Sequence, residues 1–180
     1  MSNKEKRIEI LTKIELKNTI HRLSSEIIDR VSNVEDMLLM GIPTRGVYLS
    51  DVLASKIKEI FGIKVRKGII DPTFYRDDQS RISTRLIKST NIPFTLENKQ
   101  IILIDDVIYT GRTIRAALDA LNSWGRPKKI MLLVMVDRGN RELPIQPDFC
   151  GKKLKTDKTE SIELRLDLID NEEGVFLVRN

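Results

Sequence analysis

The sequence provides almost no residues for a disulfide or for a histidine–cysteine metal site. Its 180 residues include one cysteine, Cys150, and one histidine, His21. A lone cysteine cannot form a disulfide within the chain, and disulfides are typical of oxidising compartments. Structural zinc sites need several His or Cys ligands, so this kind of metal site is excluded. We therefore expect a cytoplasmic protein that works through other side chains.

Long apolar runs are missing as well. No run approaches the roughly 18 residues that a membrane-spanning helix needs, so we expect no membrane partner. Residues 1–7 are polar and lead into no secretory segment. With 41% hydrophobic and 32% charged residues, the composition is typical of a soluble globular protein. A length of 180 residues predicts a single domain, 1–180, with a substantial core.

The charge is biased toward cations, with a formal net charge of +5 at pH 7. Such a protein suits a partner rich in phosphate, either a nucleotide or RNA. Many basic surfaces are only solvated, however. The composition alone therefore leaves RNA binding open.

The most informative segment begins with residues 101–104, an unbroken apolar run that predicts a strand buried on both faces. Asp105 and Asp106 follow at the expected carboxyl end of this strand, where open α/β sheets bind ligands. Residues 110–113, Thr-Gly-Arg-Thr, predict a turn that opens onto a helix. Apolar residues at helical spacing give that helix a buried face, and glycine and proline end it. The residues of this face are Ile114, Ala117, Leu118 and Leu121.

The turn at residues 110–113 suits a phosphate group. Backbone N–H groups and the helix dipole attract anions at a helix start. Gly111 lets the backbone come close, and the two threonine hydroxyls add donors. The acidic pair would repel phosphate, so we expect Asp105 and Asp106 to bind sugar hydroxyls or to face a hard cation such as magnesium. The combination predicts a ligand that carries a ribose and a phosphate.

Each of these features alone also fits a solvated strand end followed by an ordinary capped turn. The combination is more specific, and it excludes related sites. The segment lacks the Gly-Lys-Ser/Thr of a P-loop and the three spaced glycines of a dinucleotide fingerprint.

A second strand end repeats the pattern. Residues 37–42 predict a buried strand, and Pro43-Thr44-Arg45-Gly46 leads from it into a helix. Arg45 is well placed to meet a diphosphate, because a guanidinium group suits multidentate contact with phosphate oxygens. A plain strand-to-helix connection is the alternative.

Further elements follow from the apolar pattern. We expect an initial strand near residues 8–11, a helix over residues 12–32, strands at residues 65–70 and 129–136, and a final hairpin around residues 171–174. The polar segment between residues 71 and 91 predicts a long mobile loop or an exposed hairpin, and residues 146–153 are expected to be irregular.

These motifs resemble those of the type I phosphoribosyltransferases, and most closely those of the PyrR family. Members of that family are uracil phosphoribosyltransferases that also regulate pyrimidine operons. The resemblance lies in Asp-Asp-Val-Ile-Tyr-Thr-Gly-Arg-Thr at residues 105–113, Pro-Thr-Arg-Gly at 43–46, Thr-Phe-Tyr-Arg-Asp-Asp at 73–78 and Arg-Gly-Asn-Arg-Glu-Leu-Pro-Ile at 138–145. It extends over nearly the whole chain.

The resemblance implies an α/β protein with the type I phosphoribosyltransferase fold. Its central sheet is mostly parallel and flanked by helices, with a flexible loop at about 72–92 and a small hood at about 138–160. The implied reaction joins uracil to 5-phosphoribosyl-1-diphosphate (PRPP) and gives UMP and diphosphate, with Mg²⁺ bound together with PRPP. Asp105 and Asp106 would meet this Mg²⁺ indirectly, and no residue is assigned as a catalytic acid or base. The implied PRPP- and UMP-binding residues are Thr44, Arg45, Tyr75, Arg76, Asp105, Asp106, Val107, Tyr109, Thr110, Gly111, Arg112 and Thr113, and those facing the pyrimidine are Met135, Val136, Asp137 and Arg138.

The resemblance also implies binding of pyrimidine-operon mRNA and self-association into a homodimer or a higher homo-oligomer. The corresponding RNA-binding candidates are Arg22, Arg138, Arg141 and Lys152. The family commonly has histidine where this chain has Asn140 and Ser25, so the retention of RNA binding stays open. Two alternatives remain: a non-catalytic regulator that senses PRPP and UMP, and a purine phosphoribosyltransferase. The purine enzymes usually carry Glu-Asp in place of Asp-Asp.

Overall fold

The computed structural model describes residues 6–76 and 90–179. Its centre is a five-stranded sheet in which every neighbouring pair of strands is parallel, with the order β3-β2-β4-β5-β6. This confirms the predicted α/β class and the mostly parallel sheet. The strands are β2 (Met37–Gly41), β3 (Arg66–Ile69), β4 (Gln100–Ile108), β5 (Lys129–Asp137) and β6 (Phe149–Lys153).

The apolar run of β4 divides its side chains between two cores. Ile101 and Leu103 pack in the core on the α3 side, whereas Ile102 and Ile104 pack in the core on the α1 and α2 side. Successive side chains of a strand point to opposite faces, so a strand in the middle of a covered sheet must be apolar throughout. All four residues are fully buried.

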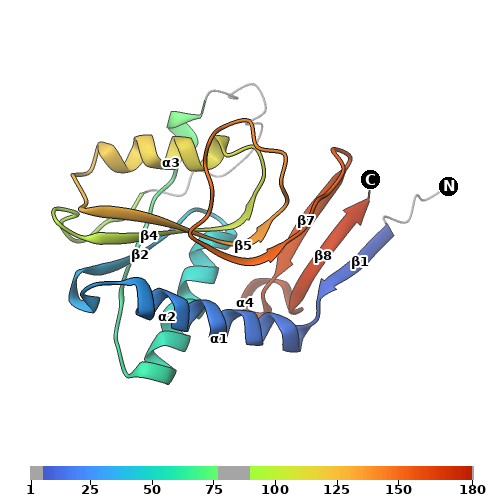
Figure 1. Cartoon of the computed structure of the whole chain (residues 1–180), viewed down its shortest axis with the longest axis horizontal. Helices are drawn as coiled ribbons and strands as arrows, with labels where there is room; N and C mark the ends of the chain where they lie inside the picture. Colours follow the sequence, from blue (N-terminus) through green and yellow to red (C-terminus); the bar gives the residue numbers. More distant parts are fainter. Residues whose placement is uncertain (1–5, 77–89, 180) are drawn as a thin grey trace.

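Helices cover both faces of this sheet. Figure 1 shows α3 (Arg112–Asn122) on one face, and α1 (Lys13–Arg30) and α2 (Arg45–Phe61) on the other. The α1 helix begins with a capping box, in which Thr12 and Glu15 exchange side-chain and backbone hydrogen bonds. The predicted face of α3 is buried at Ile114, Ala117 and Leu121.

A second, three-stranded antiparallel sheet has the order β1-β8-β7. It consists of β1 (Lys6–Leu11), β7 (Glu160–Arg165) and β8 (Gly174–Arg179). The β7–β8 pair is the predicted final hairpin, and its connection contains a short helix, α4 (Asp167–Asp170). The pairing of β1 with β8 joins the two ends of the chain, as Figure 1 shows.

Two predictions at strand boundaries were wrong. The β4 strand does not end before Asp105 but continues to Ile108, because Val107 and Ile108 extend the ladder with β5. Residues 149–153 are not irregular but form β6, which pairs with β5. The backbone hydrogen bonds of this pairing stabilise the strand, and the short basic sequence gives no sign of them.

Two short 3₁₀ helices complete the described chain, at Val34–Asp36 and Thr73–Tyr75. The expected loop at about 72–92 lies mostly outside the described residues, since residues 77–89 are not among them. None of the helices in the described ranges is both long enough and apolar enough to cross a membrane.

Candidate ligand-binding site

Two adjoining cavities lie beside the carboxyl-terminal part of β4, with volumes of about 720 and 620 Å³. Both are lined by Arg76, Asp105, Val107 and Thr113, so they form one continuous site. The first cavity is lined further by Ile108, Tyr109, Thr110, Gly111, Arg112, Ile114, Glu142 and Lys158, and the second by Pro43, Thr44, Arg45, Asp106, Ile169 and Asp170. The predicted ribose, phosphate and diphosphate residues therefore meet in one place.

The acidic pair lies within β4, where Asp105 lines both cavities and Asp106 lines the second. Asp105 pairs with Val134 of β5 and keeps only 7% of its surface exposed. One carboxylate oxygen of Asp105 accepts a 2.9 Å hydrogen bond from the Asp106 N–H, and one of Asp106 accepts a bond of the same length from the Val107 N–H. These backbone bonds hold the two carboxylates in fixed orientations.

The turn after β4 has the geometry of an anion site. Gly111 is the N-cap of α3 with φ +94°, in the left-handed region that glycine adopts at little cost. Gly111 has no side chain to cap the helix, and the first turn contains no acidic residue. The Arg112 N–H donates a long 3.4 Å bond to the Thr110 hydroxyl. No side chain in the described ranges accepts from the N–H groups of Thr113 and Ile114, which remain available to a ligand.

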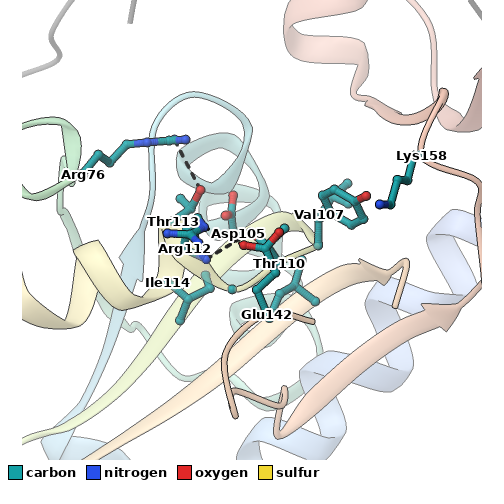
Figure 2. A pocket seen from close by; sticks show the side chains of 12 residues that line it. Arg76, Asp105, Val107, Thr110, Arg112, Thr113, Ile114, Glu142 and Lys158 are labelled. Atoms are coloured by element: carbon teal, nitrogen blue, oxygen red, sulfur yellow. Dashed lines mark hydrogen bonds and ion pairs between the residues drawn. The ribbon is translucent and has the colours of Figure 1, made fainter. Parts of the chain in front are cut away.

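The turn is braced by the segment that follows β5. The Thr110 carbonyl oxygen accepts hydrogen bonds from the N–H groups of Glu142 and Leu143, at 3.0 and 3.2 Å. On one side, the Arg112 Nε donates to the Glu142 carboxylate at 2.7 Å, and on another the Arg76 Nη1 donates to the Thr113 hydroxyl at 3.3 Å. Figure 2 shows both contacts at the cavity wall. The turn is therefore fixed before any ligand arrives.

The α2 helix places Arg45 at the second cavity. A Cβ atom on Gly46 would lie 2.3 Å from the Ile104 carbonyl oxygen, so the start of α2 lies directly against β4. The start of α2, like that of α3, has no acidic residue in its first turn and no cap from a described side chain. Two helix starts thus face the acidic pair from opposite faces of the sheet.

The Arg45 guanidinium is held by Asp170 through two hydrogen bonds of 2.7 and 3.1 Å. Burial raises the pKa of the Asp170 carboxyl, but the bonds from Arg45, the Leu166 N–H and Arg165 outweigh burial, so the net pKa is lowered. The carboxylate is therefore ionised at neutral pH.

The residues predicted to face the pyrimidine lie at the end of β5 and just after it. The Arg138 guanidinium stacks 4.1 Å from the centroid of the Tyr109 ring and donates to the Thr156 hydroxyl at 2.8 Å. Asp137 lines a smaller cavity of about 230 Å³ together with Gly139, Lys153, Leu154 and Lys155. Met135 and Val136 have fully buried side chains in the core, so only their backbone is available to a ligand.

Tyr75, predicted beside PRPP, points its hydroxyl toward Ser123 at the end of α3, at 2.8 Å. Its neighbour Arg76 lines both cavities.

The RNA-binding candidates fall into two groups. Arg22 and Lys152 are exposed, and Arg22 donates to the carbonyl oxygens of Cys150 and Gly151 beside Lys152. Arg138 is 8% exposed, and Arg141 forms a 2.7 Å ion pair with Asp137 in which both side chains are largely buried. In this structure Arg138 and Arg141 are largely buried and contact other residues of the protein.

Three charged residues that line the cavities were not predicted as site residues: Glu142, Lys158 and Asp170. Glu142 belongs to a motif that was noticed, but no role was given to it. Lys158 and Asp170 lie in connections that flank β7, far along the sequence from the central motif. Neither residue follows an apolar strand of the parallel sheet. The sequence around them therefore contains no pattern that predicts a binding site.

The described residues contain no group of three or more His, Cys, Asp or Glu side chains arranged to hold a metal ion. The nearest approach is the acidic pair in β4, whose two residues line the cavities. Such a pair fits a magnesium ion that draws most of its ligands from a bound phosphate compound and water.

The parallel sheet, with its acidic strand and the two helix starts beside it, is that of a type I phosphoribosyltransferase. The model of the family described as "Phosphoribosyl transferase domain" matches residues 8–167. Solved hypoxanthine phosphoribosyltransferases share this fold at low sequence identity. The enzyme from Staphylococcus aureus aligns with a TM-score of 0.69 at 17% identity, covering 96% of this chain and 92% of that chain. One from Trypanosoma cruzi aligns with a TM-score of 0.72 at 15% identity, covering 98% and 95%.

Relatives of much higher identity define the family more narrowly. A protein named "Bifunctional protein PyrR" from Microcystis aeruginosa is 52% identical over 172 residues, which are 96% of this chain and 97% of the relative. A protein of the same name from Listeria monocytogenes serotype 4b is 44% identical over 178 residues, with 97% of each chain covered. The chain therefore belongs to the PyrR family.

Proposed function

We propose that the protein is a uracil phosphoribosyltransferase, which converts uracil and PRPP to UMP and diphosphate. The observation that carries this proposal is the acidic pair of β4 between two uncapped helix starts. A helix start suited to an anion lies on each side of Asp105 and Asp106, which would bind a sugar. This order matches PRPP, whose ribose lies between a 5-phosphate and a 1-diphosphate. Membership of the PyrR family supports the choice of uracil as the base.

The first cavity would hold the 5-phosphate at the start of α3. Thr110 and Thr113 supply hydroxyl donors there, and Gly111 leaves the backbone accessible. The second cavity would hold the diphosphate at the start of α2, with Thr44 and Arg45 as its donors. Asp105 and Asp106 would accept hydrogen bonds from the ribose hydroxyls between them.

The base would lie against Tyr109, where the first cavity approaches the hood. The guanidinium group of Arg138 stacks on the Tyr109 ring. The guanidinium group of Arg141 donates a 2.7 Å hydrogen bond to the backbone carbonyl oxygen of Tyr109. Lys158 borders the same cavity and brings an ammonium group with three N–H donors, which suits a carbonyl oxygen of uracil. The backbone of residues 135–138 is available at the end of β5.

Magnesium would enter with PRPP, and Asp105 and Asp106 would contact its water ligands or the ribose oxygens beside it. The ion would supply positive charge that stabilises the negative charge of the diphosphate leaving group. A ring nitrogen of uracil would form the new bond to the anomeric carbon as the bond to diphosphate breaks, and its proton would pass to the departing diphosphate or to water.

The chain itself would act mainly by positioning and by charge stabilisation. Fixed N–H groups at the starts of α2 and α3 hold the two ends of PRPP, so the ribose is oriented for attack. Arg45 and Arg76 place positive charge beside the diphosphate as negative charge develops there. Arg76 bridges the two cavities, so it would contact PRPP at its centre.

The decisive experiment measures conversion of labelled uracil to UMP with PRPP and magnesium, with hypoxanthine as the competing base. We expect the parent protein to use uracil and to reject hypoxanthine. The double variant Asp105→Asn/Asp106→Asn keeps the side-chain shapes but removes both charges, and we expect at least a hundredfold loss of kcat/KM on the scale of a lost charge-stabilising group. Turnover of hypoxanthine instead of uracil would support the purine alternative. PRPP binding without turnover of either base would support a sensing role.

We propose a second function, binding of pyrimidine-operon mRNA, carried by the exposed neighbours Arg22 and Lys152. The word "bifunctional" in the relatives' name supports two activities in one chain. Titration of such an RNA at several salt concentrations tests it, since each lost phosphate contact reduces the salt slope. We expect Arg22→Ala to weaken binding and reduce that slope, whereas Lys58→Ala on the exposed side of α2 should not. We also propose that the protein self-associates, which sedimentation measurements would decide.

A further inference from the structure

Asp170 lies in the second cavity, but the function proposed above gives it no task. It ends α4, in the connection between the strands of the small sheet, and it contacts Arg45 at the start of α2. One carboxylate oxygen lies 2.7 Å from the Arg45 Nη1, and the other lies 3.1 Å from the Nη2. This is a bidentate contact between residues 125 positions apart in the chain.

The Asp170 carboxylate is itself held firmly. It accepts a 3.1 Å hydrogen bond from Arg165 and a 2.9 Å bond from the Leu166 N–H. Arg165 is held in turn by Glu163 at 2.5 Å. The side chain of Asp170 is only 7% exposed. A carboxylate with four fixed donors cannot turn away from Arg45 without leaving those donors unpaired, which is costly in a buried place.

Arg45 keeps donors for a ligand in spite of this contact. A guanidinium group has five N–H donors in a planar fork, and Asp170 occupies one on each of the two terminal nitrogens. No other residue in the described ranges accepts a hydrogen bond from Arg45. With 26% of its side chain exposed at the cavity, the group can meet a phosphate oxygen while it stays bound to Asp170.

We propose that Asp170 is a positioning residue for the diphosphate end of the substrate, and that it acts by fixing the guanidinium group of Arg45. An unrestrained arginine side chain loses rotamer freedom when it binds a ligand. Asp170 imposes this order before the ligand arrives, so binding costs less. The inference rests on the proposed function, since it assumes that a diphosphate occupies the second cavity.

The test measures binding of PRPP with magnesium by titration calorimetry, which requires no turnover. Four proteins are compared with the parent: Asp170→Asn, Arg45→Ala, the double variant, and Glu163→Gln as the matched control. Glu163 belongs to the same charged cluster but contacts Arg165 and not Arg45. Thermal unfolding of each protein shows whether the variants fold.

We expect Asp170→Asn to weaken PRPP binding about tenfold, which corresponds to about 1.4 kcal/mol, and Glu163→Gln to leave it within about twofold. In the Arg45→Ala background, Asp170→Asn should have almost no further effect, because a residue that acts through Arg45 has nothing left to position. In turnover measurements, the KM for PRPP should rise while the KM for uracil stays unchanged.

Three results would overturn the inference. PRPP binding by Asp170→Asn could be unchanged, or it could be tighter, which would mean that Asp170 competes with the diphosphate. Asp170→Asn could also cause the same loss of binding in the Arg45→Ala background as in the parent. A parent protein that binds no PRPP at all would refute the proposed function itself, so the two failures are distinguishable.

Discussion

At the scale of single residues, the wall of the first cavity is completed by Lys158, which comes from the connection between β6 and β7. Figure 2 shows its side chain extending toward the cavity from the side opposite Arg76. No hydrogen bond or ion pair joins Lys158 to another described residue, so its donors are available to a ligand. The carbonyl oxygens of a pyrimidine such as uracil are suitable acceptors for this group.

Replacement of Lys158 tests its role in binding the base. Lys158→Met keeps most of the length of the side chain and removes the ammonium group. A lost hydrogen bond to a charged group costs about 1.5 kcal/mol or more, so we expect the KM for uracil to rise roughly tenfold. The KM for PRPP should change little. Lys58→Met on α2 is the control, and an unchanged KM for uracil in the Lys158 variant would show that the base does not contact this group.

At the scale of elements, the site depends on how closely α2 lies against β4. A Cβ atom on Gly46 would come within 2.3 Å of the Ile104 carbonyl oxygen and 3.1 Å of the Asp105 Cα. Both neighbours are backbone atoms of a central strand, which cannot move away without disturbing the sheet. The closeness that brings Arg45 to the acidic pair therefore leaves no room for a side chain at residue 46.

We expect Gly46→Ala to destabilise the fold by about 1–3 kcal/mol, the usual cost of overpacking. The start of α2 must shift away from β4, so the KM for PRPP should rise more than the KM for uracil. Urea unfolding and steady-state kinetics measure these two effects. Ser55→Ala, at an exposed position of the same helix, should change neither quantity. A Gly46→Ala protein of parental stability would contradict the close contact.

The elements also show how far the sequence alone could predict this structure. Continuous apolar runs and helical spacing predicted the central strands and the helices on both faces, because burial dictates those patterns locally. The end of β4 was misplaced since Asp105 and Asp106 interrupt the apolar run, although the ladder with β5 continues past them. The β6 strand was missed because its hydrogen bonds to β5 are invisible in a short basic sequence.

The site divides in the same way. The residues of the two strand-to-helix turns were predicted because each motif is contiguous in the sequence. Asp170 and Lys158 were not, because they reach the cavities only through the folding of the small sheet onto the large one. Likewise, the sequence could not show that Arg138 and Arg141 are turned inward, since arginine is usually a surface residue.

At the scale of the whole molecule, the ion pair of Arg45 and Asp170 links the two sheets. Arg45 begins α2, which packs on the parallel sheet, and Asp170 lies in the hairpin of the antiparallel sheet. The link between the sheets is also a wall of the second cavity. Stability and ligand binding therefore share one contact, and conditions that weaken this contact should weaken both.

Acid provides such a condition. The pKa of Asp170 in the folded protein lies below its usual value of 3.8, because the hydrogen bonds to its charged form outweigh burial. A carboxyl group whose pKa is lower in the folded state stabilises the fold above its unfolded pKa, and this contribution is lost as the pH falls through the folded value. We expect the parent protein to lose more unfolding free energy than Asp170→Asn between about pH 5 and pH 2, because the amide does not titrate.

Urea unfolding of both proteins across this range measures the difference. Other carboxyl groups with lowered pKa values, such as that of Glu173, titrate in both proteins and cancel in the comparison. Parallel stability curves would show that the link between the sheets does not depend on the charge of Asp170.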